Sequence, residues 1–128
     1  SFPTLRSSDL GQSGSPRIYA ISQGTGGGPG DVAAIETSGN TISSTLPVGR
    51  GPVYGVMTND LRRAFILNQT DGTVTVINSE TNQLDSPVTT IPVGVRPVWA
   101  DLAPTLNDLV VLNEGDGTSR GSVSIVAS

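Results

Sequence analysis

One nine-residue segment occurs twice in this chain of 128 residues, and the second copy lies 45 residues after the first. Leu46-Pro-Val-Gly-Arg-Gly-Pro-Val-Tyr54 returns as Ile91-Pro-Val-Gly-Val-Arg-Pro-Val-Trp99. Without a gap, residues 46–72 and 91–117 share ten identities over 27 positions, whereas unrelated sequences of ordinary composition would share about two. The chain is therefore built from repeated units of about 45 residues.

The composition favours short strands joined by turns. The chain has 16 Gly and 9 Pro, and only 14% of its residues are charged. Val, Ile, Leu and Thr are frequent, and no segment of useful length has the hydrophobic spacing of an amphipathic helix. A repeat of this length in such a sequence predicts an all-β fold, a partial β-propeller of consecutive four-stranded antiparallel meander blades.

Strand-like segments start only after residue 16. Residues 1–10 resemble a translated sequencing-library adapter, with one difference at Leu5, so we expect 1–16 to be a non-native or disordered terminus. We expect an incomplete blade at 17–49, a complete blade at 50–94 and an incomplete blade at 95–128. The strands expected in these blades cover residues 18–21, 31–35, 41–46, 53–57, 63–67, 73–77, 88–91, 98–102, 109–112 and 122–126.

The repeated segment marks the step from one blade to the next. Proline occurs at both ends of Pro47-Val-Gly-Arg-Gly-Pro52, where it fixes the backbone and removes a hydrogen-bond donor. We therefore expect this hinge to separate the outer strand of one blade from the inner strand of the next. Asp71-Gly72 and Asp116-Gly117 are interpreted as hairpin turns, because a calcium loop needs further carboxylates nearby.

The motifs follow a fixed order along the middle unit. Pro-x-Gly-x-x-Pro and a strand are followed by Phe65-Ile-Leu-Asn68, Asp71-Gly-Thr-Val-Thr-Val-Ile-Asn78 and Ile91-Pro-Val-Gly94. This order resembles the YVTN-type β-propeller repeat family, although the second strand departs from the family's Tyr-Val-Ala-Asn and keeps only its asparagine. The resemblance covers residues 17–128 and implies an extracellular, periplasmic or cell-surface location in a prokaryote. The repeat itself is architectural and implies no catalytic residue.

A closed propeller has about four to eight blades, and the predicted strands supply fewer than three. We therefore interpret the chain as a fragment, whose partners are the neighbouring blades of a full-length chain. Self-association of short arrays into a ring is the alternative.

Charge and residue types exclude several classes of site. The net charge of −4 and the pI near 4.4 argue against a nucleic-acid partner. The chain has no Cys and no His, so we expect no metal site, no cofactor and no conventional catalytic triad. No apolar run reaches the length of about 18 residues that predicts a membrane span.

Candidate ligand-binding residues are those expected around the channel mouth of such a fold. Asp101 stands where the middle unit has Val56. Its carboxylate either binds a ligand or cation, or is a solvated channel residue or one bonded to a neighbouring hinge amide, and the second interpretation is favoured. Tyr54 and Trp99 occupy matching positions, which favours packing between blades over a stacking platform for a ligand. The full candidate set is Arg50, Tyr54, Arg96, Trp99 and Asp101, on a face that would also carry Gln69, Asp71, Glu114, Asp116 and Arg120.

Three functions remain open at this point. The first is a non-catalytic module that acts as a binding or surface/envelope scaffold for a protein or small-molecule ligand at the channel face. The second is a fragment of a propeller enzyme, either a lactonase-like hydrolase or a quinoprotein-like dehydrogenase, with its site at the channel mouth. The third is a structural array without a ligand. Asp101 is the residue that distinguishes them, since an enzyme needs more such groups in the other blades.

Overall fold

The computed structural model describes residues 17–127 except 37–38, 59–61, 104–107 and 119. The predicted terminus at 1–16 lies outside the described residues. Every regular element in the described part is a β-strand, and every strand pairing is antiparallel. The strands are β1 (Arg17–Ser22), β2 (Pro29–Glu36), β3 (Thr41–Arg50), β4 (Pro52–Met57), β5 (Arg63–Asn68), β6 (Thr73–Asn78), β7 (Gln83–Leu84), β8 (Thr90–Pro92), β9 (Pro97–Leu102), β10 (Leu109–Asn113) and β11 (Ser122–Val126).

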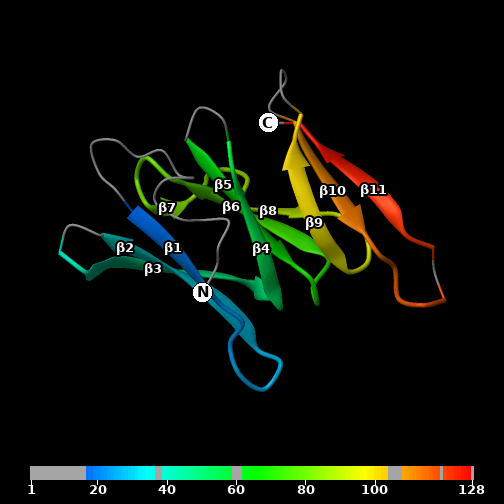
Figure 1. Ribbon diagram of the computed structural model, residues 1–128, viewed down its shortest axis with the longest axis horizontal. Helices are drawn as coiled ribbons and strands as arrows, with labels where there is room; N and C mark the ends of the chain where they lie inside the picture. Colours follow the sequence, from blue (N-terminus) through cyan, green and yellow to red (C-terminus); the bar gives the residue numbers. More distant parts are fainter. Residues whose placement is uncertain (1–16, 37–38, 59–61, 104–107, 119, 128) are drawn as a thin grey trace.

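The strands form three sheets in chain order, which we call sheets 1, 2 and 3 (Figure 1). Sheet 1 has the order β1-β2-β3, sheet 2 the order β4-β5-β6 followed by β7 and β8, and sheet 3 the order β9-β10-β11. Chain neighbours pair with each other because the turns between them are short, as in an up-and-down meander. The predicted all-β class is confirmed, with antiparallel sheets throughout the described residues.

The outer position of sheet 2 differs from the prediction of one strand at 88–91. Two short strands share it: β7 pairs with the end of β6 at Ile77, and β8 pairs with its start at Val74. Between them residues 86–88 leave the sheet. Val76 bridges the gap, because its carbonyl accepts from the Asp85 N–H at 2.9 Å and its N–H donates to the Thr89 carbonyl at 2.8 Å.

The predicted hinge at Pro47–Pro52 was wrong in its extent. β3 runs through Pro47 to Arg50, and Gly51 alone separates it from β4. Proline is tolerated in β3 because this strand lies at the edge of sheet 1, where a missing N–H costs no ladder bond. Gly51 has a φ of 64°, and Arg96, which takes its place in the second copy, has a φ of 56°. The crossing between sheets therefore depends on one left-handed residue.

Gly51→Ala is expected to lower the free energy of unfolding by about 2–4 kcal/mol, because it adds a steric clash to a left-handed backbone. A methyl group there would collide with the hydroxyl of Thr70 and lie 3.1 Å from its backbone nitrogen. Gly26 is the matched control, since its φ is 62° and nothing lies within 4 Å of an added methyl. Gly26→Ala is expected to cost only about 1 kcal/mol. Equal losses in urea denaturation would contradict the role of the Thr70 contact.

Two hydrophobic cores lie between the three sheets. β5 belongs to both, because five of its six residues are buried and alternate side chains face opposite sheets. Along their inner edges β1 contacts β4 and β4 contacts β9, so the sheets fan out from these strands (Figure 1). The core between sheets 1 and 2 contains Tyr19, Val32, Ala34, Leu46, Val48, Ala64, Ile66 and Ile77. The core between sheets 2 and 3 contains Phe65, Leu67, Val74, Val76, Ala100, Leu109, Val111 and Val126.

Candidate functional site

Each crossing between sheets is held by backbone bonds to the next sheet. At the first crossing the N–H groups of Gln69 and Thr70 donate to the carbonyls of Gly51 and Arg50, at 2.8 Å and 3.2 Å. At the second crossing Glu114 and Gly115 donate to Arg96 and Val95 in the same pattern, both at 3.0 Å. The turn after the second strand of a sheet therefore fixes the incoming crossing, whatever side chains it carries.

A buried asparagine strengthens this arrangement at the first crossing. The Asn68 Oδ1 accepts from the N–H of Gly49 at 3.1 Å, and its Nδ2 donates to the hydroxyls of Thr73 and Thr75 at 3.1 Å and 2.8 Å. Asn68 is fully buried, so it is a structural residue. Its backbone partner is the crossing strand of the preceding sheet.

Asn113 occupies the equivalent position at the second crossing. Its Nδ2 donates to the hydroxyl of Ser124 at 3.0 Å, and the side chain lies against Gly94. Its buried Oδ1 has no hydrogen-bond partner among the described residues. The second crossing is therefore held less completely than the first.

Both Asp-Gly pairs lie in turns, but their aspartates accept hydrogen bonds from different parts of the chain. Gly72 and Gly117 both have positive φ, at 67° and 93°. The Asp71 carboxylate accepts from the Arg50 N–H at 2.9 Å, which adds another bond to the first crossing. The Asp116 carboxylate instead accepts from the N–H and hydroxyl of Thr118 within its own turn. Among the described residues no three acidic, His or Cys side chains form a group able to hold a metal ion.

The two candidate arginines do not form one site. Arg50 ends β3 and its side chain is exposed, whereas Arg96 is the left-handed residue of the second crossing. The two are not equivalent in the repeat, because Arg50 corresponds to Val95 and Arg96 to Gly51. Arg96 donates to Glu114 at 2.7 Å in an exposed ion pair. Arg120, the third arginine expected on the face around the channel mouth, is also exposed.

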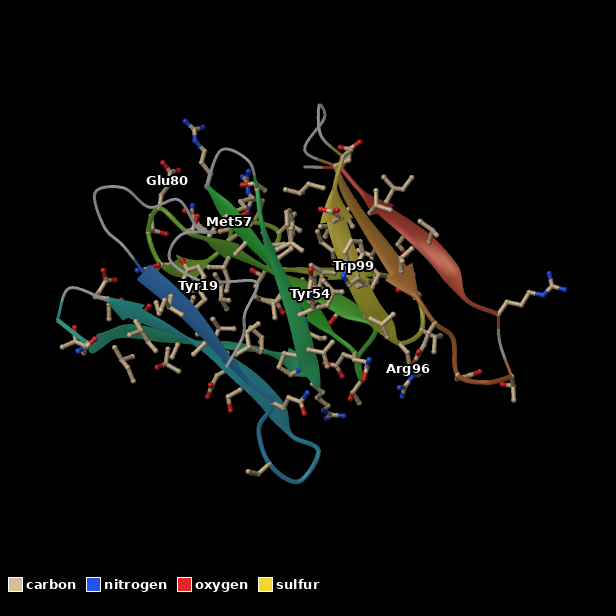
Figure 2. All side chains as sticks on the ribbon, in the orientation of Figure 1. Tyr19, Tyr54, Met57, Glu80, Arg96 and Trp99 are labelled. Carbon is tan, nitrogen blue, oxygen red and sulfur yellow. The ribbon has the colours of Figure 1, made fainter. Side chains whose placement is uncertain are left out.

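Three of the five candidate residues do come together, on the inner strands. The rings of Tyr54 on β4 and Trp99 on β9 have centroids 6.1 Å apart and planes tilted by 30° (Figure 2). Asp101, two residues along β9 on the same face, is exposed and accepts from the N–H of Leu102 at 2.9 Å. Trp99 remains 44% exposed. We call Tyr54, Trp99 and Asp101 the inner-strand cluster; Figure 2 shows Arg96 away from it, before the start of β9.

Burial and the nearby Asp101 carboxylate raise the pKa of Tyr54, and burial is the larger cause. Asp101→Asn is therefore expected to lower the Tyr54 pKa without restoring its ordinary value, since burial remains. The chain has only two tyrosines, so tyrosinate absorbance in a Tyr19→Phe background reports Tyr54 alone. Asp31→Asn is the control, because this exposed acid lies on sheet 1. An unchanged Tyr54 pKa in Asp101→Asn would show that the two groups do not interact.

Two hollows lie outside the inner-strand cluster. One of about 400 Å³ is lined by residues 69–72 and 93–96, beside the second crossing. The other, of about 240 Å³, has Phe65 and Val76 on its floor and the Arg63–Asp85 ion pair, at 3.0 Å, beside it. The second hollow could not be predicted from the sequence, because it forms where residues 86–88 leave the sheet, and a continuous strand at 88–91 would have filled it.

No helix long and apolar enough to cross a membrane is present in the part of the chain that the structure describes.

Comparison with known proteins yields a fold but no family. No family model and no curated protein matches the chain. A solved structure titled Kuenenia stuttgartiensis Hydrazine Synthase is similar with a TM-score of 0.72 at 15% identity. The match covers 87% of this chain and 30% of that chain, so this chain spans less than a third of its length. At this identity the similarity concerns the all-β fold alone.

Proposed function

We propose that the chain is a non-catalytic binding scaffold, and that its three sheets are consecutive blades of a β-propeller with YVTN-type repeats. The observation that carries this proposal is a difference in role between the features that the two copies of the repeat share and the residues in which they differ. In both copies the turn after the second strand bonds the backbone of the crossing, and at the first crossing the side chains of Asn68 and Asp71 add further bonds to that backbone. Side chains that differ, such as Asp101 in place of Val56, stand on the inner strands where a partner can reach them.

A constant frame with variable exposed positions is the arrangement of a binding module. The inner-strand cluster offers a half-exposed indole, a tyrosine hydroxyl and a carboxylate on adjacent strands. These groups suit a protein or small-molecule ligand with an apolar ring face and a hydrogen-bond donor. Arg50 would contribute separately at the crossing face. By resemblance we also propose an extracellular, periplasmic or cell-surface location in a prokaryote.

The enzyme alternative is tested through Asp101. Lactone hydrolysis and dye-linked alcohol oxidation, the latter with and without added quinone cofactor, are measured on the wild-type chain and on Asp101→Ala. We expect both proteins to give the rate of buffer alone. Turnover that is present in the wild type and lost in Asp101→Ala would contradict a non-catalytic role and favour a lactonase-like or quinoprotein-like fragment.

The propeller architecture is tested by length. Arrays of about four to eight concatenated copies of residues 50–94 are made and measured by small-angle X-ray scattering. A propeller closes into a ring at one number of copies. From that number on, the radius of gyration is smaller than that of an open stack with the same number of copies. A radius that rises steadily with every added copy would contradict the propeller and indicate an open array.

A further inference from the structure

We propose that Asp116-Gly117 is a modification site, where the folded chain forms isoaspartate spontaneously, whereas its counterpart in the repeat, Asp71-Gly72, is protected. Both pairs are followed by threonine, so the two residues after each aspartate are the same. Both aspartates are also exposed. A difference in reactivity between the two sites must therefore come from how each folded turn holds its backbone.

The reaction needs only the chain itself and water. The Gly117 nitrogen attacks Cγ of the protonated Asp116 carboxyl, a C–N bond forms, and the amide proton and the carboxyl hydroxyl leave as water. Glycine favours this step, because it has no Cβ to hinder the close approach. The cyclic succinimide then takes up one water. Addition at the side-chain carbonyl restores aspartate, and addition at the backbone carbonyl gives isoaspartate, which has the same mass and oxidation state.

Asp71-Gly72 is held by hydrogen bonds on both sides of the peptide that would have to react. The Gly72 N–H donates to the Asn68 carbonyl at 2.9 Å, and the Gly72 carbonyl accepts from the Val93 N–H at 2.9 Å. The Asp71 carboxylate is itself bonded to the Arg50 N–H at 2.9 Å. Ring closure requires the amide and carboxylate bonds to open first, so this site reacts only through a minor open population.

Asp116-Gly117 lacks these restraints. The Gly117 N–H donates no hydrogen bond to any of the described residues, and nothing lies within 4 Å of a Cβ placed on this glycine. The Asp116 Oδ1 accepts from the N–H and the hydroxyl of Thr118, at 2.9 Å and 2.8 Å, so the carboxyl turns toward the backbone that follows it. Both donors also stabilise the negative charge that Oδ1 gains when the nitrogen attacks Cγ.

Isoaspartate lengthens the main chain by one atom beside the second crossing. Glu114 and Gly115, whose N–H groups bond the carbonyls of Arg96 and Val95, lie immediately before Asp116. The product also carries a free α-carboxylate in an exposed turn, which is the group that isoaspartyl methyltransferases esterify with S-adenosylmethionine. The inner-strand cluster takes no part in this reaction, so the site does not depend on the proposed binding role.

Ageing of the whole chain at neutral pH provides the test. A glutamate-specific protease separates the two sites, because cleavage after Glu36, Glu80 and Glu114 yields residues 37–80 and 115–128 as different peptides. Isoaspartate is quantified by methyl transfer from labelled S-adenosylmethionine and located by electron-transfer mass spectrometry. We expect it to accumulate in 115–128 at least about tenfold faster than in 37–80, because a bonded amide reacts only when it opens.

Two controls separate the effect of the fold from that of the sequence. In urea, where both turns are unfolded, the two sites should form isoaspartate at similar rates. In the folded chain Gly117→Ala should slow the reaction at Asp116, because the added methyl group hinders the attacking nitrogen and the turn has room for it.

Three results would overturn the proposal. Equal rates at Asp71 and Asp116 in the folded chain would show that the bonds of the first turn give no protection. Isoaspartate that forms at Asp116 in urea but not in the folded chain would show that the second turn is protected as well. An unchanged rate in Gly117→Ala would show that the product does not arise by attack of this nitrogen.

Discussion

Leu67→Ala is expected to lower the free energy of unfolding by about 2–5 kcal/mol, whereas the same change at Leu112 should cost less than about 1 kcal/mol. The two leucines occupy the same position in successive repeats. Leu67 is fully buried between sheets 2 and 3, whereas Leu112 is 42% exposed on the outward side of sheet 3. Residue type, strand and neighbouring asparagine are the same at both sites, so the difference measures what the covering sheet contributes.

Urea denaturation at low protein concentration measures both losses on the monomer. A buried leucine loses its transfer free energy and leaves a cavity, because Phe65 and Val111 on either side of the core cannot close in fully. Leu112 has no such cavity to leave. Equal losses at the two positions would mean that sheet 3 does not pack on sheet 2 as described.

Most strands could be predicted from sequence because their side chains alternate between two environments. Thr73–Asn78 and Ser122–Val126 show this period of two, and both are strands within one residue of the predicted bounds. Prediction failed where the backbone departs from that period. Gln83–Leu84 is too short to show an alternation, and residues 86–88 leave the sheet without any signal in hydrophobic pattern. The crossing was misjudged because edge strands tolerate the prolines that end central strands.

The candidate site could be predicted only where the repeat aligned its members. Tyr54 and Trp99 match in successive copies, and the structure places their rings in contact. Arg50 and Arg96 were grouped by residue type, although they differ by one position when the two copies of the repeat are aligned. The structure gives them separate surroundings. The bonds that hold each crossing come from backbone N–H groups. Backbone groups are the same in every sequence, so no residue pattern could have revealed them.

Asn68→Ala is expected to lower the free energy of unfolding by about 2–3 kcal/mol, because it leaves buried polar groups without partners. The Gly49 N–H loses its acceptor, and the hydroxyls of Thr73 and Thr75 lose a donor. Asn78→Ala is the matched control, since its Oδ1 accepts from Glu80 at 3.0 Å in an exposed turn. That change should cost less than about 1 kcal/mol.

A double-mutant cycle with Thr75→Val separates the loss of the Asn68 hydrogen bonds from a general loss of packing. Thr75 is buried and its hydroxyl accepts from the Asn68 Nδ2 at 2.8 Å, so the two substitutions should couple by about 1 kcal/mol. Hydrogen exchange at the Gly49 amide should also quicken in Asn68→Ala relative to Asn78→Ala, because its acceptor is gone. Additive losses with unchanged exchange at Gly49 would mean that the amides of Gln69 and Thr70 hold the crossing without the asparagine.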